Sequence, residues 1–226
     1  MDKPTRHEQR SAESQERLIL ATQALILRQG YTATTIDQIC AEAGLTKGSF
    51  FHHFANKEAI GSAAIDAWGA MGTRLYSAAW SDPAMDPLTQ LNRMFDIMIS
   101  FTKGEDPCAC VIGMMSQELA QSHPELAALC AKHLDDWTSH VARMLDAAKK
   151  RHKPAKPFDS QRVGWFLNSI WQGSMLIGKV RRKPQTIVDN LEQARAYVAA
   201  LFVTTSTNGA KRTVVANKPR KKPVKT

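Results

Sequence analysis

The sequence predicts an all-α protein with about nine helices: three at the N-terminal end and a larger helical region after them. Apolar residues recur at the i, i+3, i+4, i+7 spacing of helices through most of the chain, whereas the period-two alternation of strands never lasts. Runs of β-branched residues are also absent. Because 43% of the residues are hydrophobic and 23% are charged, the chain can bury a sizeable core.

The first predicted helix begins after Ser14, a candidate N-cap, and ends at Gln29. Its apolar face has the expected spacing and consists of Leu18, Ala21, Thr22, Leu25 and Ile26. Gly30 is a candidate left-handed C-cap. Residues 1–13 are polar and show no periodicity, so we expect them to be flexible.

Two short helices follow, joined by a glycine-containing turn. The first, Ile36 to Ala43, ends at Gly44, and the second begins at Thr46, a candidate N-cap, and reaches Phe54. Two helices joined by a turn of three to four residues are typical of the helix-turn-helix, whose second helix enters the major groove of DNA. An ordinary helical hairpin inside a core is the alternative interpretation.

Six further helices are predicted, separated by segments rich in proline, glycine or lysine; they cover residues 57–80, 88–102, 110–121, 125–151, 160–180 and 185–203. The expected domains are a helix-turn-helix domain at 14–60, a larger helical domain at 61–205 and a disordered basic tail at 206–226.

The net charge of +9 is concentrated in that tail: residues 209–226 hold seven lysines and arginines and no acidic residue. Over residues 1–54, six basic residues balance six acidic ones. Global charge is therefore weak support for DNA binding by the folded part.

Beyond these patterns, the sequence is similar to a known family. The run Ala-Gly-Leu-Thr-Lys-Gly-Ser-Phe-Phe-His-His-Phe-Ala-Asn-Lys-Glu at 43–58, with Gly-Tyr and Thr-Thr before it, resembles the N-terminal domain of the TetR family of bacterial transcriptional regulators. The match covers roughly residues 17–60 without a gap. The resemblance implies a homodimer that represses transcription from a near-palindromic double-stranded DNA operator. It also implies that a small-molecule effector binding the C-terminal domain releases the operator.

The resemblance implies DNA contacts for Thr34, Thr35, Thr46, Lys47, Gly48, Ser49, Phe51, His52 and Lys57. The residue types suit this role, since Lys47 offers a cation to a phosphate or a guanine edge and Gly48 lets the helix approach the bases. Phe51 departs from the family, which usually has a phosphate-binding tyrosine there. For Thr35 and Thr46, helix capping is a further role that does not exclude DNA contact.

The C-terminal region resembles one branch of the same family in two segments. Residues 110–119 match at Cys110, Gly113 and Glu118, and residues 169–180 resemble the helix that pairs across the dimer. The expected dimer interface, a four-helix bundle, includes Trp165, Gly173, Met175, Leu176, Tyr197 and Leu201. The expected effector pocket, suited to an apolar or aromatic molecule, includes Met94, Met98, Cys110, Met114, Trp137 and Trp171. An ordinary core role is the alternative for each pocket residue.

Cys110 raises a second hypothesis, that its thiol senses electrophiles or oxidants. It follows Cys108 and a loop proline at a predicted helix N-terminus, where the helix dipole lowers a thiol pKa, and Lys103 is a possible helper. A small buried residue explains Cys110 equally well. A transcriptional activator of the same family is also compatible with the sequence.

Other function classes are disfavoured. Cys130 and His133 share a helical face, and His140 lies two turns beyond His133, which could suggest a metal site or a nucleophile. No third ligand has a fitting spacing, and neither a glycine-rich phosphate loop nor the context of a catalytic triad is found. We therefore expect no enzyme, metal site or cofactor. An architectural DNA-binding protein would not need the large apolar C-terminal region. No apolar run reaches membrane-helix length, and the first residues lack the apolar core of a signal peptide. We therefore expect a cytoplasmic protein that has no membrane partner.

Overall fold

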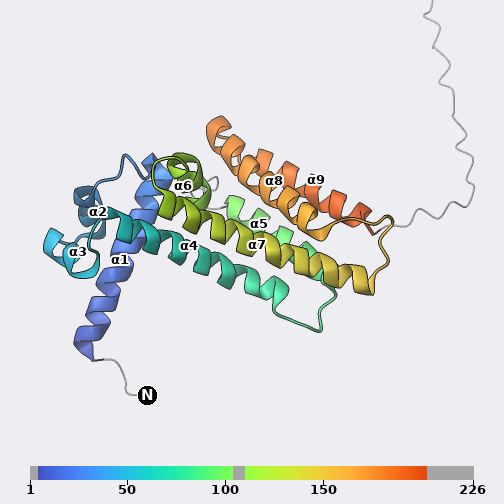
Figure 1. Cartoon of the computed structure of the whole chain (residues 1–226), viewed down its shortest axis with the longest axis horizontal. Coiled ribbons are helices and arrows are strands. Elements are labelled where there is room, and N and C mark those ends of the chain that lie inside the picture. The colour runs from blue at the N-terminus through green and yellow to red at the C-terminus, as the bar shows by residue number, and fades with distance from the viewer. Residues whose placement is uncertain (1–4, 104–109, 203–226) are drawn as a thin grey trace, which may run out of the picture.

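The fold is all-α, as predicted. The computed structural model describes residues 5–103 and 110–202, and within these ranges it contains nine α-helices, one short 3-10 helix and no strand (Figure 1). The α-helices are α1 (Arg6–Gln29), α2 (Ile36–Ala43), α3 (Lys47–His53), α4 (Lys57–Trp80), α5 (Pro87–Ser100), α6 (Val111–Leu119), α7 (Pro124–Arg151), α8 (Ser160–Arg181) and α9 (Gln185–Ala200). The 3-10 helix η1 (Phe101–Lys103) extends α5.

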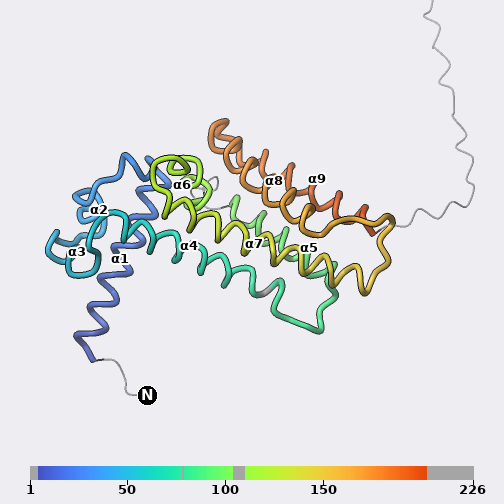
Figure 2. The backbone as a smooth tube through the Cα atoms, viewed as in Figure 1, coloured from blue at the N-terminus to red at the C-terminus, as the bar shows by residue number. Residues whose placement is uncertain are grey.

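The helices form a small head joined to a longer bundle. Helices α1, α2 and α3 gather at one end of the molecule, and α4 and α7 run side by side away from it (Figure 1). Helices α8 and α9 lie against each other along one outer side, and α6 lies over the junction between the head and α7 (Figure 2). A single helix, α4, thus passes from the head into the bundle.

Three apolar clusters hold these parts together. Leu18, Ile39 and Phe50 belong to the core of the head, in which all three are fully buried. A second cluster, which includes Ile26 and Met115, joins α1 to α4, α6 and α7 at the junction. The third fills the bundle between α4, α5, α7, α8 and α9. The junction therefore has a core of its own, which packs the head against the bundle.

The start of α1 differs from the expectation. Helix α1 begins at Arg6, so the prediction that residues 1–13 are flexible is wrong for 5–13; residues 1–4 lie outside the described ranges. Thr5 and Glu8 form a capping box, in which the Thr5 amide donates to Glu8 Oε2 at 2.7 Å and the Glu8 amide donates to Thr5 Oγ1 at 3.3 Å. Ser14 is not a cap, because its hydroxyl donates to the Arg10 carbonyl inside the helix. Polar residues can thus extend a capped helix without an apolar stripe.

The remaining boundaries agree with the sequence to within a few residues. Helix α6 begins after Cys110 and ends at Leu119, before the expected Gln121. The basic tail at 206–226 lies outside the described ranges, so its disorder stays a prediction. Among the helices that the structure describes, none has the length and apolarity needed to cross a bilayer.

Candidate functional site

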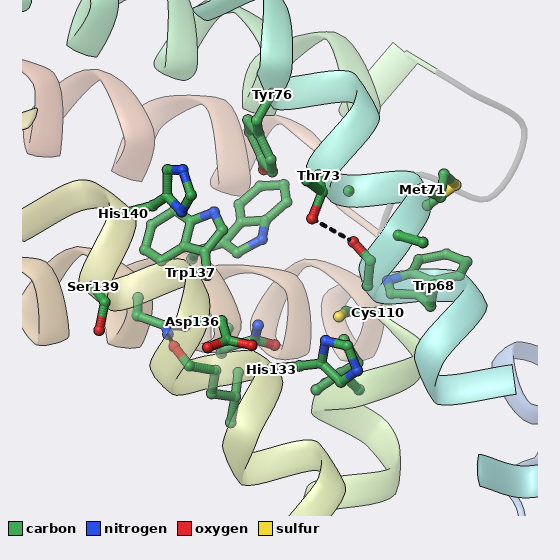
Figure 3. A pocket seen from close by; sticks show the side chains of 18 of the residues that line it. Trp68, Met71, Thr73, Tyr76, Cys110, His133, Asp136, Trp137, Ser139 and His140 are labelled. Carbon is green, nitrogen blue, oxygen red and sulfur yellow. Dashed lines mark hydrogen bonds between the residues drawn. The ribbon is translucent and has the colours of Figure 1, made fainter. Parts of the chain in front are cut away.

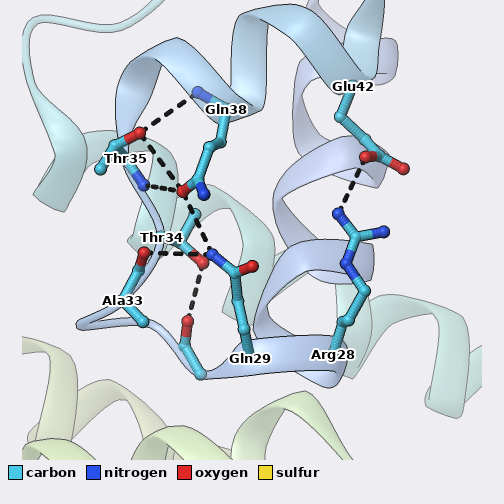
Figure 4. Close-up of polar contacts among 8 residues, drawn as sticks. Arg28, Gln29, Ala33, Thr34, Thr35, Gln38 and Glu42 are labelled. Carbon is cyan, nitrogen blue, oxygen red and sulfur yellow. Dashed lines mark hydrogen bonds and ion pairs between the residues drawn. The ribbon is translucent and has the colours of Figure 1, made fainter.

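The head holds α2 and α3 in a rigid turn. Thr35 caps α2 through a capping box with Gln38, in which the backbone N–H of Gln38 donates to Thr35 Oγ1 at 3.2 Å (Figure 4). Gly44 then takes a left-handed conformation (φ 63°, ψ 39°) that ends α2, a conformation that glycine adopts at little cost. Thr46 caps α3 by accepting a hydrogen bond from the Ser49 amide at 3.2 Å. Local sequence therefore sets the angle between the two helices.

Helix α3 separates a buried face from an exposed one. Phe50 is fully buried in the head, whereas Phe51 is 55% exposed although it is a large apolar residue. Lys47, Gly48 and His52 are exposed on the same short helix. This face therefore presents a cation, an imidazole and an apolar ring to solvent, while Gly48 leaves the helix backbone open to close approach.

The cation of this face has an internal partner. Lys47 Nζ lies 2.7 Å from Asp37 Oδ1 on α2, and both side chains are mostly exposed. The hydrogen bond and the charge of Asp37 raise the pKa of Lys47 above its ordinary value. The ammonium is therefore charged, and Asp37 holds it near the start of α3. Because both side chains are exposed, the ion pair adds little to the stability of the fold.

A carboxylate connects the bundle to the head. Glu118, near the end of α6, accepts hydrogen bonds from the amides of Tyr31 at 2.8 Å and Thr32 at 2.7 Å, in the loop between α1 and α2. Gly30 has φ +90°, and a Cβ there would lie 3.0 Å from Glu118 Oε2, so this close approach requires glycine. We call this contact the Glu118 clasp.

Lys57, the first residue of α4, completes the clasp. Its ammonium donates to the Thr32 carbonyl at 3.2 Å and lies 4.4 Å from the centre of the Tyr31 ring. Burial lowers the pKa of Lys57, while nearby Glu118 and Glu58 oppose that shift. The loop between α1 and α2 is thus held by α4 on one side and by α6 on the other.

A cavity of about 510 Å³ lies inside the bundle, mainly between α4, α7 and α8 (Figure 3). Its aromatic lining consists of Trp68, Tyr76, Trp80, Phe101, Trp137 and Trp171. On α4 the wall between Trp68 and Tyr76 includes three small residues, Gly69, Ala70 and Gly72, beside Met71 and Thr73. This volume is within the range of sites that bind small molecules.

Two glycines of this wall provide a matched test of its packing. A Cβ at Gly69 would lie 2.3 Å from the His133 ring, whereas one at Gly72 would meet no atom within 4 Å. We expect Gly72→Ala to stabilise the protein by up to about 1 kcal/mol, because alanine favours the helix. Gly69→Ala should gain nothing or lose stability, since His133 must move and weaken its 2.8 Å contact with Asp66. Thermal unfolding of both variants measures the difference, and equal melting temperatures would contradict it.

Comparison with known proteins agrees with this architecture. The family model for the N-terminal domain of bacterial regulatory proteins of the tetR family matches residues 18–64. A model for the tetracyclin repressor-like C-terminal domain matches residues 87–195. The chain belongs to the TetR family. It is therefore a DNA-binding transcriptional regulator, and the resemblance seen in the sequence is confirmed.

Individual relatives of this TetR-family chain are distant. It is 27% identical over 177 residues to the transcriptional regulator AcuR of Cereibacter sphaeroides, covering 75% of this chain and 78% of that one. It is 23% identical to the HTH-type transcriptional repressor NemR of Escherichia coli, covering 90% and 98%. Among solved structures, a regulatory protein TetR from Rhodobacter sphaeroides has a TM-score of 0.72 at 23% identity, covering 84% and 99%. That likeness shows that the fold is shared.

The predicted DNA-contact residues of this TetR-family head divide into two groups. Thr35, Thr46, Lys47, Gly48, Phe51 and His52 are exposed and Ser49 is partly exposed. Thr34 is 1% exposed, and its hydroxyl donates to the Gly30 carbonyl at 2.7 Å, so its assignment to DNA contact was wrong (Figure 4). Lys57 is held in the Glu118 clasp, which gives it a partner within the protein.

The cavity brings together only half of the residues expected at an effector site. Cys110, Trp137 and Trp171 line it. Met94 and Met98 were expected there, but they are fully buried in the bundle core, because α5 turns its apolar stripe towards α7 and α9. Met114 is not part of the lining, and its sulfur accepts a hydrogen bond from Lys179 at 3.4 Å. The sequence interpretation missed Tyr76, Asn168 and Gln172, which also line the cavity. The small residues of α4 could have indicated that this helix borders a cavity.

The predicted activation of Cys110 is not observed. Cys110 is the N-cap residue of α6, as expected, but burial raises the pKa of its thiol. The nearby N–H groups of Gly113, Ile112, Gln172 and Trp68 oppose this shift without reversing it, and the thiol makes no capping hydrogen bond with α6. The helix terminus therefore does not compensate for the loss of hydration, and the thiol stays protonated. Cys108 lies outside the described ranges.

The expected dimer residues also divide. Trp165, Leu176 and Tyr197 are exposed, at 40%, 47% and 42%, and a Cβ on Gly173 would meet no atom within 4 Å. Met175 was placed at the interface, but it is 5% exposed and lines the cavity, because it lies on the opposite side of α8 from the exposed stripe. Leu201 is half-buried and packs against the bundle core.

Proposed function

We propose that this regulator is a homodimeric repressor that binds a near-palindromic operator and releases it when a small molecule enters the cavity. The observation that carries the proposal is the course of α4. Its first turns reach the core of the head at Ile60, its middle belongs to the junction cluster at Ile65, and its later turns line the cavity from Trp68 to Trp80. A ligand that favours one position of α4 would therefore also favour one position of the head.

The clasp offers a second route from the cavity to the head. Cys110 lines the cavity at the start of α6, and Glu118 holds the loop before α2 near its end. A shift of α6 would therefore pull on the same loop that Lys57 holds from α4. Both routes meet where α2 begins, so they would change the angle at which the head presents α3.

The outer face of α8 and α9 supports a homodimer. Exposed apolar residues follow one stripe of α8, which we define as Trp165, Phe166, Leu176, Ile177 and Val180, and Tyr197 of α9 lies beside it. The rings of Phe166 and Tyr197 are 5.0 Å apart. A contiguous apolar patch of this kind is typical of an interface, and a second copy of the chain would offer the same patch across a two-fold axis.

The DNA-binding role of α3 is tested through Lys47. We expect Lys47→Ala to weaken operator binding about five- to tenfold and to lower the salt slope by about one, because one phosphate or base contact is lost. Lys132→Ala is a matched control, since Lys132 is equally exposed and pairs with Asp136 at 2.9 Å on α7. An operator is first selected from a library of random DNA duplexes. The affinity of each variant for this operator is then measured by titration at several salt concentrations. Equal effects of the two variants would contradict the assignment.

The sign of regulation is tested separately. A reporter gene placed behind the selected operator should be less active when the protein is present, because the relatives DhaR and NemR are described as repressors. Increased reporter activity would instead support an activator with the same DNA-binding geometry.

A further inference from the structure

The interior of the cavity is aromatic and flat-walled. Six aromatic side chains line it, and the rings of Trp80 and Tyr76 are 5.0 Å apart on neighbouring turns of α4. On the opposite wall, Trp137 meets Tyr76 edge to face at 6.4 Å (Figure 3). Aromatic walls in such offset arrangements favour a planar ring between them.

The titratable and charged groups of the lining each contact a neighbouring side chain. His133 contacts Asp66 at 2.8 Å, Asp136 pairs with Lys132 at 2.9 Å and Arg143 contacts His140 at 2.7 Å. Asp66 and Asp136 are mostly exposed to solvent. An ionised ligand that entered the aromatic interior would lose its hydration. The contact of Arg143 with the His140 imidazole leaves its positive charge uncompensated, but Arg143 is an exposed residue and supplies no buried counter-charge. The interior therefore favours an uncharged molecule.

One donor in this interior lacks a partner. The indole Nε1 of Trp137 is buried and makes no hydrogen bond. Burial raises the pKa of Tyr76, and the nearby indole N–H of Trp137 opposes this rise. The indole N–H and the Tyr76 hydroxyl nevertheless do not form a hydrogen bond. Buried N–H groups are nearly always satisfied, so this donor indicates the place of an acceptor atom from a ligand.

We propose that the cavity binds a neutral, planar aromatic molecule whose carbonyl-type oxygen accepts hydrogen bonds from the Trp137 N–H and the Tyr76 O–H. This inference rests on the proposed function, because it names the chemical class of the effector. The apolar rings of the cavity supply most of the affinity, and the two donors orient the molecule. The donors also distinguish it from a hydrocarbon of the same shape.

Equilibrium dialysis with three probes of matched shape tests this proposal. The probes are 2-acetylnaphthalene, which has the acceptor; 2-ethylnaphthalene, which lacks it; and 2-naphthoate, which is charged. We expect the ketone to bind at least about tenfold more tightly than the carboxylate. Tyr76→Phe should weaken ketone binding about fivefold, the loss of one hydrogen bond, and leave hydrocarbon binding unchanged. Trp137→Phe also removes apolar area, so it should weaken binding of both probes, but that of the ketone about fivefold more.

The hydrocarbon serves as the control for folding, because a variant that still binds it retains the cavity. In either variant, a loss for the ketone no larger than that for the hydrocarbon would overturn the hydrogen-bond assignment. A carboxylate that binds as tightly as the ketone would overturn the requirement for a neutral molecule, and absence of binding by all three would overturn the ligand class. Operator release is measured apart from binding. A ketone that binds without releasing the operator upholds the ligand class and contradicts the proposed effector role.

Discussion

Leu176→Asp is expected to dissociate the proposed homodimer. Leu176 lies on the exposed stripe of α8 at 47% exposure, and a two-fold interface would bury two such aspartates, one from each copy. Burying an unpaired carboxylate among apolar side chains costs several kcal/mol, so the dissociation constant should rise at least about a hundredfold. Light scattering coupled to gel filtration should then give the mass of one chain instead of two.

Leu75→Asp is the matched control for this change. Leu75 is 41% exposed on α4, outside the stripe, so its replacement should leave the dimer intact. Operator binding should be lost only in the Leu176 variant, because a single α3 reads only one half-site. A dimer that survives the Leu176 substitution, or dissociates equally in both variants, would show that the interface lies elsewhere.

Removal of the Glu118 carboxylate is expected to loosen the head. Glu118→Ala deletes two charge-assisted hydrogen bonds and leaves the Tyr31 amide, next to a buried ring, without its partner. Because Glu118 is partly exposed, water compensates for some of the lost hydrogen bonding. The free energy of unfolding should therefore fall by about 2 kcal/mol, and the melting temperature by several degrees. Hydrogen exchange of the Tyr31 and Thr32 amides should accelerate, which localises the effect.

The effect of Glu118 should also depend on pH in a defined direction. Burial alone would raise the pKa of Glu118, but hydrogen bonds from Thr32 and Tyr31 and the charge of Lys57 hold it below its ordinary value of 4.5. A carboxyl whose pKa falls on folding stabilises the protein fully above the unfolded pKa, and this contribution disappears as the pH drops through the folded value. The difference in melting temperature from the native protein should thus be constant near neutrality and shrink in acid below 4.5.

Glu16→Gln provides the reference for both measurements. Glu16 is an exposed carboxylate on α1 that makes no hydrogen bond within the described residues, so its loss should change neither stability nor amide exchange. An equal effect of the two substitutions would mean that the clasp contributes nothing beyond surface charge.

Local patterns in the sequence were sufficient for the helices and for the head. The spacing of apolar residues and the Thr35 and Thr46 caps each depend on residues close in the chain, and the structure shows them as expected. The start of α1 was missed because a capping box of polar residues carries no apolar period. Thr34 and Thr35 look equivalent in the sequence, yet the turn after Gly30 directs one hydroxyl inwards and leaves the other exposed.

The bundle could be predicted less well because its contacts join distant segments. Met175 and Leu176 are neighbours on α8, and only the position of α7 decides which of them faces the cavity. Similarly, the raised pKa of Cys110 follows from burial beneath other helices, which a local argument from the helix dipole does not include. Glu118 was recognised by resemblance alone, since its partners, Tyr31 and Thr32, lie more than 80 residues earlier in the chain.

The distribution of the tryptophans gives this protein two separate optical reporters. Trp68, Trp80, Trp137 and Trp171 line the cavity, whereas Trp165 lies exposed on the outer stripe of α8. Occupation of the cavity should therefore change the intrinsic fluorescence of the inner four, and association of two chains should shield Trp165 from a dissolved quencher such as iodide. A Trp165→Phe chain would retain only the inner signal, so ligand entry and self-association could be followed independently without any attached dye.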